Sequence, residues 1–179
     1  GTFNVKGNCG LDIDLLSNAD VLYLSSYFGR QHGEVFAIRA KKPKTVNPKE
    51  GRHPWSDDLD FRMWTACTYN FWNGAAIHCR LENELRRDAD GFYTIIASKA
   101  KYAPANLDDT DATWMDTGVF LDGQFQFRYV YRENPYVQAI AKGVMGEGVA
   151  EEYRDYVPKA AHCSKSVYER DGWRGCLEP

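Results

Sequence analysis

The sequence predicts a mainly β protein, an antiparallel, jelly-roll-like β-sandwich whose single domain spans residues 1–179. Three observations favour this fold. Short runs rich in β-branched and aromatic residues recur along the chain. Turn signals separate several of these runs, because Gly and Asn tolerate positive φ. Aromatic residues make up 14% of the chain, which supplies bulky side chains for a core between two sheets.

Seven runs have the composition and length of β-strands. In chain order they are residues 21–27, 34–40, 61–69, 75–82, 92–98, 114–120 and 124–131. The turns expected between them lie at residues 28–33, Asn73-Gly74, Asp90-Gly91 and 121–123. The run 34–40 alternates as a half-buried strand does, with Val35 and Ala37 on one face and Phe36 and Ile38 on the other.

The remaining segments are expected to be irregular chain and short helices. The irregular segments are residues 1–20, 41–60, 102–113 and 158–179, the last of them stapled by a disulfide. Asn134 followed by Pro135 is typical of a helix start, so residues 135–142 predict a short helix that ends at Gly143. Residues 148–156 are expected to form a second short helix.

Five cysteines are present, and none belongs to a C-x-x-C motif. Cys67 with Cys79 and Cys163 with Cys176 are the local pairs, and each closes a short loop. Antiparallel neighbours lie at distances that suit a disulfide, so we expect both pairs, although other pairings stay open. Cys9 is then unpaired or bonded to another chain. Disulfides favour a secreted, periplasmic or cell-surface location.

The motifs FRMWTAC, HC, DADGFYTIIAS, APAN, TW and FQFRYVY follow one another between about residues 18 and 158. This succession resembles a group of uncharacterised, mostly bacterial secreted proteins with the pattern R-Y-W-S-x-C, D-x-D-G-Y-Y-T-I-V-V-S, R-P-A-N and W-L-P-W-G. More distantly, it is similar to the C-terminal domain of the DUF1254/DUF1214 proteins. The matching positions are Arg62, Trp64, Cys67, Cys79, Asp90, Gly91, Pro104, Asn106, Trp114 and Arg128. The resemblance implies a β-sandwich and no particular reaction.

Charge and motif content argue against several classes of function. The net charge is −3 and both signs are interspersed, so the sequence shows no basic patch of the kind that binds nucleic acid. No apolar run approaches the roughly 20 residues of a membrane-spanning helix. No recognised catalytic motif is present, so the sequence favours a non-enzymatic protein over an enzyme. His78-Cys79 and His162-Cys163 invite a metal site, but neighbours in a strand point to opposite faces, and we expect structural histidines.

Acidic residues gather in the loop at Asp108, Asp109 and Asp111. Calcium binds six to eight oxygen ligands, and closely spaced carboxylates can supply several of them. This loop is therefore the calcium candidate, with a solvated loop as the alternative. No other cofactor is expected.

Two arginines, Arg62 and Arg128, fall within expected strands. A buried guanidinium needs a carboxylate or an aromatic partner. We expect them to pair with an acid such as Asp90 or to stack on Trp64 and Tyr129.

Four aromatic residues form the candidate binding site: Trp55, Tyr69, Phe71 and Trp72. Phe71 and Trp72 are expected at a turn, where burial is difficult, and exposed aromatic rings anchor protein partners or stack on sugars. The leading expectation is therefore a non-enzymatic module that binds a protein or self-associates, as a subunit of a larger extracellular complex. The alternatives are a carbohydrate-binding module and a hydrolase with an unrecognised pair of carboxylates.

Overall fold

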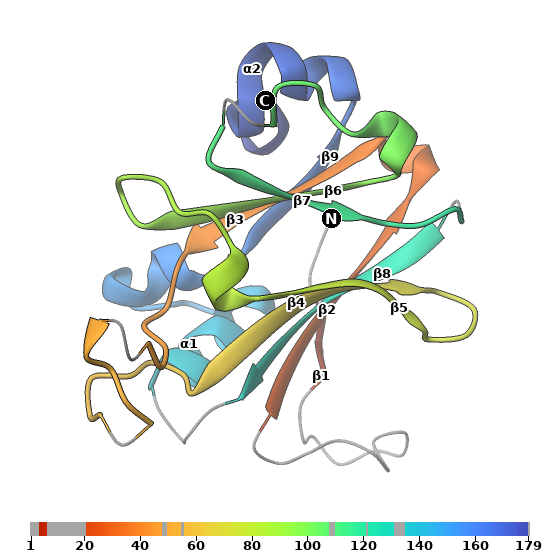
Figure 1. Cartoon of the computed structure of the whole chain (residues 1–179). Helices are drawn as coiled ribbons and strands as arrows, with labels where there is room; N and C mark the ends of the chain where they lie inside the picture. Colours follow the sequence, from red (N-terminus) through yellow and green to blue (C-terminus); the bar gives the residue numbers. More distant parts are fainter. Residues whose placement is uncertain are drawn as a thin grey trace.

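Two β-sheets face each other across an apolar core in the computed structural model (Figure 1). The structure describes residues 4–6, 21–47, 50–54, 56–107, 110–120, 122–130 and 135–178. The predicted mainly β sandwich is confirmed.

The larger sheet has five antiparallel strands in the order β1-β2-β8-β4-β5. Their bounds are β1 (Asn4–Lys6), β2 (Val21–Gly29), β4 (Met63–Asn70), β5 (Ala76–Leu81) and β8 (Asp122–Val130). The smaller sheet has the order β7-β6-β3-β9, in which β6 and β7 are parallel. Its strands are β3 (Val35–Lys41), β6 (Phe92–Ser98), β7 (Ala112–Asp116) and β9 (Lys159–Cys163).

The described part of the chain contains two α-helices. Helix α1 (Pro135–Val144) comes after β8, and α2 (Lys165–Leu177) comes after β9. Four short 3-10 helices complete the described elements: η1 (Arg30–His32), η3 (Glu82–Glu84), η4 (Ala100–Tyr102) and η6 (Glu151–Tyr156). None of the helices in the described part of the chain has the length and apolar character that crossing a membrane requires.

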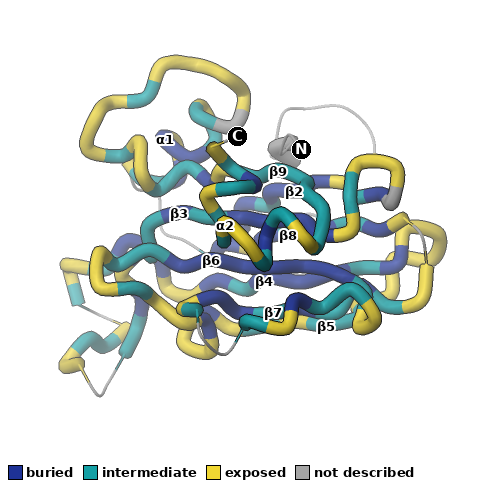
Figure 2. The backbone as a smooth tube through the Cα atoms, turned by 90° about the horizontal axis from the view of Figure 1, so that it is seen from above, coloured by how far each residue is buried: buried dark blue, intermediate teal, exposed yellow. Residues whose placement is uncertain are grey.

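The core between the sheets is built on aromatic contacts. Trp64 of β4 is fully buried, and its ring centroid lies 5.0 Å from that of Tyr93 on the opposite sheet and 5.6 Å from that of Phe127. Such pairs add about 0.5–1.5 kcal/mol each beyond the burial of their area. Val137 and Ile140 of α1 pack into the same cluster. Figure 2 shows the buried residues as a continuous layer along the central strands.

Helix α2 covers the outer face of the smaller sheet and forms a third layer (Figures 1 and 2). The Ser164 side chain caps the helix by accepting a hydrogen bond from the Val167 N–H at 3.2 Å. Tyr168 and Cys176 are buried against Val35 and Ala37 of β3. Both faces of β3 are therefore covered.

Both predicted disulfides are present: Cys67–Cys79 joins β4 to β5, and Cys163–Cys176 joins β9 to α2. The first pair sits directly opposite in the ladder, with a Cα–Cα distance of 4.1 Å. Cys9 lies outside the described residues.

Several sequence predictions are wrong. Residues 158–179 are not irregular, because they form β9 and α2. Residues 4–6 of the segment 1–20 form a strand, and the rest of that segment lies outside the described residues. The runs 114–120 and 124–131 do not pair across a turn, since β7 and β8 belong to different sheets and Asp122-Gly123 opens β8.

The arginine prediction is also wrong. Arg62 and Arg128 are exposed, and Arg128 lies over the Tyr23 ring at 5.7 Å. The enclosed arginine is Arg39, because α2 covers the face of β3 on which it lies.

Arg39 ties three elements together. Its guanidinium lies 4.7 Å from the ring centroid of Phe92 and 4.1 Å from that of Trp173 on α2. It donates hydrogen bonds to Thr94 and Asp88, and the side chains of Arg39 and Asp88 are only 13% and 21% exposed. Burial raises the pKa of Asp88, but the hydrogen bonds from Arg39 and from the Phe92 N–H outweigh it and lower that pKa. We call this set of contacts the Arg39 clasp.

Removing the Arg39 charge is expected to destabilise the protein. In Arg39→Met, Asp88 loses its partner and Trp173 loses a stacked cation, so the free energy of unfolding should fall by about 2–3 kcal/mol. Urea unfolding of Arg39→Met, with the exposed Arg62→Met as the matched control, measures it. A loss of less than about 0.5 kcal/mol, the size of an ordinary surface substitution, would contradict the clasp.

Candidate functional site

A groove of about 320 Å³ lies at one end of the larger sheet, where β2 ends, β8 begins and the chain turns from β4 into β5. The described residues that line it are Tyr27, Phe28, Gly29, Gln31, His32, Phe71, Trp72, Asp122 and Gly123. We call it the aromatic groove. Its residues come from three stretches of the chain, 27–32, 71–72 and 122–123, that the sheet register brings together.

The aromatic side chains of the groove face solvent. Tyr27, Phe71 and Trp72 are 47%, 49% and 76% exposed. They form a chain of edge-to-face contacts, with centroid distances of 5.6 Å from Tyr27 to Phe71 and 5.4 Å from Phe71 to Trp72. Large rings that stay exposed in such a contiguous set are characteristic of binding surfaces.

The turn that carries Phe71 and Trp72 is held by hydrogen bonds. The Asn70 N–H donates to the Ala75 carbonyl at 2.9 Å, and the Asn70 side chain accepts from the Trp72 N–H at 2.8 Å. Gly74 has a φ of 67°, so the predicted Asn73-Gly74 turn is confirmed. The rings are therefore presented on a fixed backbone.

Two glycines allow the floor of the groove to form. A Cβ at Gly123 would collide with the Phe28 ring, and a Cβ at Gly29 would lie 2.8 Å from Asp122 Oδ1. Gly29 and Asp122 are register partners at the ends of β2 and β8. Glycine at both positions lets an aromatic ring and a carboxylate approach the backbone closely.

Polar groups lie beside the rings. The Gln31 side-chain nitrogen and His32 Nε2 are 3.0 Å apart, and Asp122 is the only carboxylate among the described residues that line the groove. The groove therefore offers a ring platform, hydrogen-bonding groups and one negative charge.

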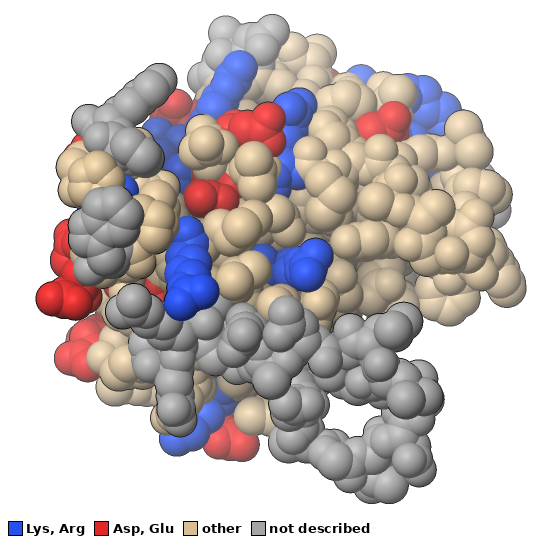
Figure 3. Space-filling view, turned by 60° about the horizontal axis from the view of Figure 1, so that its bottom comes forward, with Lys and Arg blue, Asp and Glu red and all other residues tan. Residues whose placement is uncertain are grey.

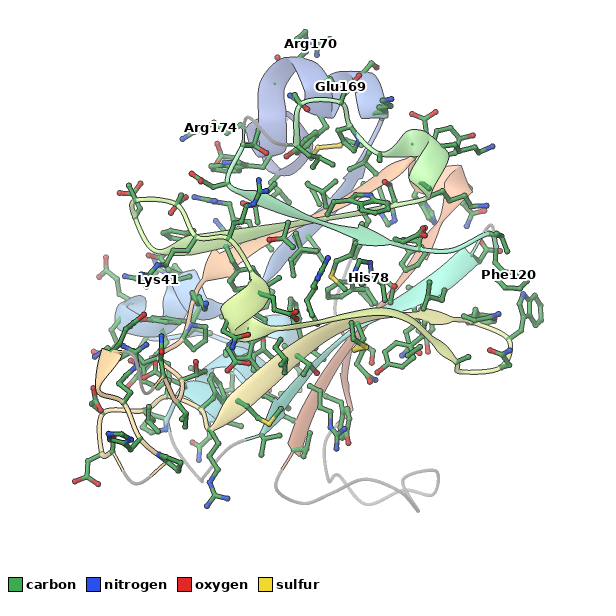
Figure 4. All side chains as sticks on the ribbon, in the orientation of Figure 1. Lys41, His78, Phe120, Glu169, Arg170 and Arg174 are labelled. Atoms are coloured by element: carbon green, nitrogen blue, oxygen red, sulfur yellow. A yellow bond between two sulfur atoms is a disulfide. The ribbon has the colours of Figure 1, made fainter. Side chains whose placement is uncertain are left out.

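Two further apolar side chains outside the groove are exposed. Val119 and Phe120, in the connection before β8, are 84% and 43% exposed. Figure 4 places Phe120 at the same end of the molecule as the turn between β4 and β5. Figure 3 shows that the face turned to the viewer is largely uncharged towards this end, whereas its charged residues gather towards the other.

The histidines have structural surroundings. His78 Nδ1 accepts from the Asp116 N–H at 3.0 Å, and burial lowers the pKa of His78. The His162 ring lies 4.7 Å from that of Phe36 and 5.4 Å from that of His32, and burial lowers the pKa of His162 to about 4. Within the described residues, no group of three or more His, Cys, Asp or Glu side chains could hold a metal ion.

Asp60 is buried, at 5% exposure. It accepts a hydrogen bond from the Lys44 N–H at 2.7 Å, and burial raises its pKa. Tyr136 of α1 also donates to it, and Asp60 is not among the described residues that line the groove. Asp60 therefore anchors α1 and the loop before β4.

The predicted site residues have different outcomes. Phe71 and Trp72 line the groove, whereas Tyr69 is half-buried on the outer face of β4, where burial raises its pKa. Trp55 lies outside the described residues. So do Asp108 and Asp109, while Asp111 is exposed, and the calcium site stays a prediction.

Sequence reasoning missed Tyr27, Gln31, His32 and Asp122. No local motif marks them, because their proximity to Phe71 depends on the pairing of β2 with β8 and of β8 with β4. The available signals were weak: Tyr27 directly precedes the expected turn at residues 28–33, and Asp122 precedes Gly123 in another expected turn.

Comparison with known proteins gives structural neighbours alone. No protein-family model matches the chain, and no curated protein matches it. An uncharacterized protein from Burkholderia cenocepacia is similar with a TM-score of 0.53 and 18% identity, over 75% of this chain and 32% of that one. The VPA0106 protein from Vibrio parahaemolyticus gives a TM-score of 0.41 and 20% identity, over 66% of this chain and 28% of that one. This chain thus spans a third or less of either neighbour, and the likeness to the Burkholderia cenocepacia protein concerns the fold alone.

His162 makes stability depend on pH. Its pKa is about 4 in the folded protein and near the ordinary histidine value of 6.5 when unfolded, so between these values the unfolded chain binds more protons. The free energy of unfolding should therefore decrease as the pH falls from 6.5 to 4, and His162→Phe should reduce that decrease. Urea unfolding across this range measures both slopes. Identical slopes in the two proteins would exclude a contribution from His162.

Proposed function

We propose that the chain is a non-enzymatic binding module that acts outside the cytoplasm, secreted, periplasmic or at the cell surface, and that it binds or assembles with a protein through the aromatic groove. The observation that carries this proposal is the contiguous set of exposed rings formed by Tyr27, Phe71 and Trp72. The disulfides Cys67–Cys79 and Cys163–Cys176 support the location, because such bonds persist in oxidising compartments.

The energetics of the exposed rings favour a protein partner. Trp and Tyr are the residue types most enriched among the few interface residues that carry most of the binding energy. Trp72 is the most exposed of the three rings, so it has the most surface to bury on a partner. The hydrogen-bonded turn already holds its backbone in place, which reduces the entropy lost on binding.

The extent of the exposed apolar surface also favours a protein partner. Phe120 lies at the same end of the molecule as the turn between β4 and β5 (Figure 4), and both Phe120 and its neighbour Val119 are exposed, so apolar surface at this end is not confined to the groove. A protein covers such a surface more completely than a small ligand does, and specific interfaces need about 800 Å² from each partner.

A carbohydrate-binding module is the second candidate. Sugars stack their C–H faces on aromatic rings and use their hydroxyl groups for hydrogen bonds. Gln31 and Asp122 line the same groove as Phe71 and Trp72, so both kinds of contact are available there. The third reading, a hydrolase, stays a prediction, since Asp122 is the single carboxylate among the described residues of the groove.

Truncation of the most exposed ring tests the proposal. We expect the mass of the full chain, measured by light scattering over a series of concentrations, to rise above the monomer value of 20.4 kDa. Trp72→Ala should weaken this association about 30-fold, the effect of roughly 2 kcal/mol at an interface hot spot. Met145→Ala is the matched control, because Met145 is an exposed apolar residue outside the groove.

Other outcomes separate the candidates. A monomer that binds oligosaccharides on a glycan array, and loses them on Trp72→Ala, would favour carbohydrate binding. Association that survives Trp72→Ala but disappears with reductant or Cys9→Ser would place the contact at Cys9 and contradict the groove as the interface. A monomer that binds no glycan would contradict both self-association and carbohydrate binding.

A further inference from the structure

A second pocket, of about 250 Å³, lies between α2 and the outer face of the smaller sheet. Six of its lining residues bear on what it binds: Arg39, Asp155, Lys159, Trp173, Arg174 and Glu178. They come from β3, η6, β9, α2 and the residue that follows α2. We call it the α2 pocket. None of the residues that line it belongs to the aromatic groove.

The charges of the α2 pocket are not balanced in pairs. Lys159 lies directly opposite Arg39 in the ladder between β3 and β9, and like charges in that position repel. Asp88 neutralises Arg39. Within the described residues, no ion pair involves Lys159, Arg174, Asp155 or Glu178. Two cations and two anions therefore line one small space, and none of the four has an ion-pair partner in the described part of the chain.

One wall of the α2 pocket is apolar and held in place. The Trp173 ring has the Arg39 guanidinium 4.1 Å and the Arg174 guanidinium 4.5 Å from its centroid. Gly172 precedes it with a φ of 63° and a ψ of −153°, so the chain kinks just before Trp173. The disulfide Cys163–Cys176 fixes the same stretch of α2 to β9. Leu177 also lines the pocket. Figure 4 shows Arg174 on this helix.

We propose that the α2 pocket binds a small zwitterion, a free amino acid with an apolar side chain. Its carboxylate pairs with Lys159 and Arg174, its ammonium group pairs with Asp155 and Glu178, and its side chain lies against Trp173. All four charged side chains are exposed, so each can contact a ligand at the mouth of the pocket, and a zwitterion matches both pairs whereas a ligand with one charge matches one of them. The volume lies just below the roughly 300–1,000 Å³ of pockets for drug-sized ligands, so the ligand is small.

Three probes that share one ring and differ in charge test this proposal. L-phenylalanine is the zwitterion, phenylpropionate carries the carboxylate alone, and phenethylamine carries the ammonium group alone. An NMR titration of the full chain follows the indole N–H signal of Trp173, which is identified by its disappearance in Trp173→Phe. We expect L-phenylalanine to shift this signal and to bind about tenfold more tightly than either analogue.

Matched variants assign the charges. Lys159→Gln and Glu178→Gln should each weaken the binding of L-phenylalanine about tenfold. Arg62→Gln and Asp57→Asn remove exposed charges of the same signs outside the pocket and should leave binding unchanged. A thermal melt of each variant checks that it remains folded.

Three results would overturn the assignment. Equal affinities for phenylpropionate and L-phenylalanine would show that the acidic pair takes no part. Binding that Lys159→Gln and Glu178→Gln leave unchanged would place the ligand elsewhere. The absence of any shift of the Trp173 signal at saturating L-phenylalanine would exclude the site.

Discussion

The Arg39 clasp is the interaction on which the outer half of the fold depends. Arg39 projects from a strand whose two faces are both covered, and a guanidinium removed from water needs charge compensation and hydrogen bonds. Asp88 supplies the opposite charge, Thr94 accepts a hydrogen bond, and Phe92 and Trp173 enclose the planar group. Because Trp173 belongs to α2, the same contacts hold the C-terminal helix on the sheet.

The three-layer arrangement separates the two candidate binding sites. The aromatic groove lies at an end of the larger sheet. Its exposed rings contact one another, and Gln31 and His32 line the same groove. The α2 pocket forms because α2 packs over the smaller sheet, where the disulfide and the Arg39 clasp hold it. The first site suits a broad apolar partner, and the second suits a small charged ligand. The two proposals therefore assign ligands of different chemistry to separate sites on one scaffold.

Much of the sandwich could be predicted from local patterns, because the strand runs and the turns at Asn73-Gly74 and Asp90-Gly91 depend on nearby residues. The predicted strand 92–98 has the observed bounds. Helix α2 was missed because Gly172 and Gly175 interrupt its helical pattern, and its stability comes from packing on β3 and not from local propensity. Phe71 and Trp72 were found from their turn, whereas the rest of the groove needs the register of distant strands.

Native-state hydrogen exchange tests most directly whether α2 is an integral part of the fold. The amides of α2 and of β3 should exchange with similar free energies, because the clasp and the disulfide Cys163–Cys176 make them one cooperative unit. Exchange of the α2 amides through a local opening, while the β3 amides stay protected, would show that the helix is a peripheral appendage. That result would remove the basis for both the clasp and the pocket beneath α2.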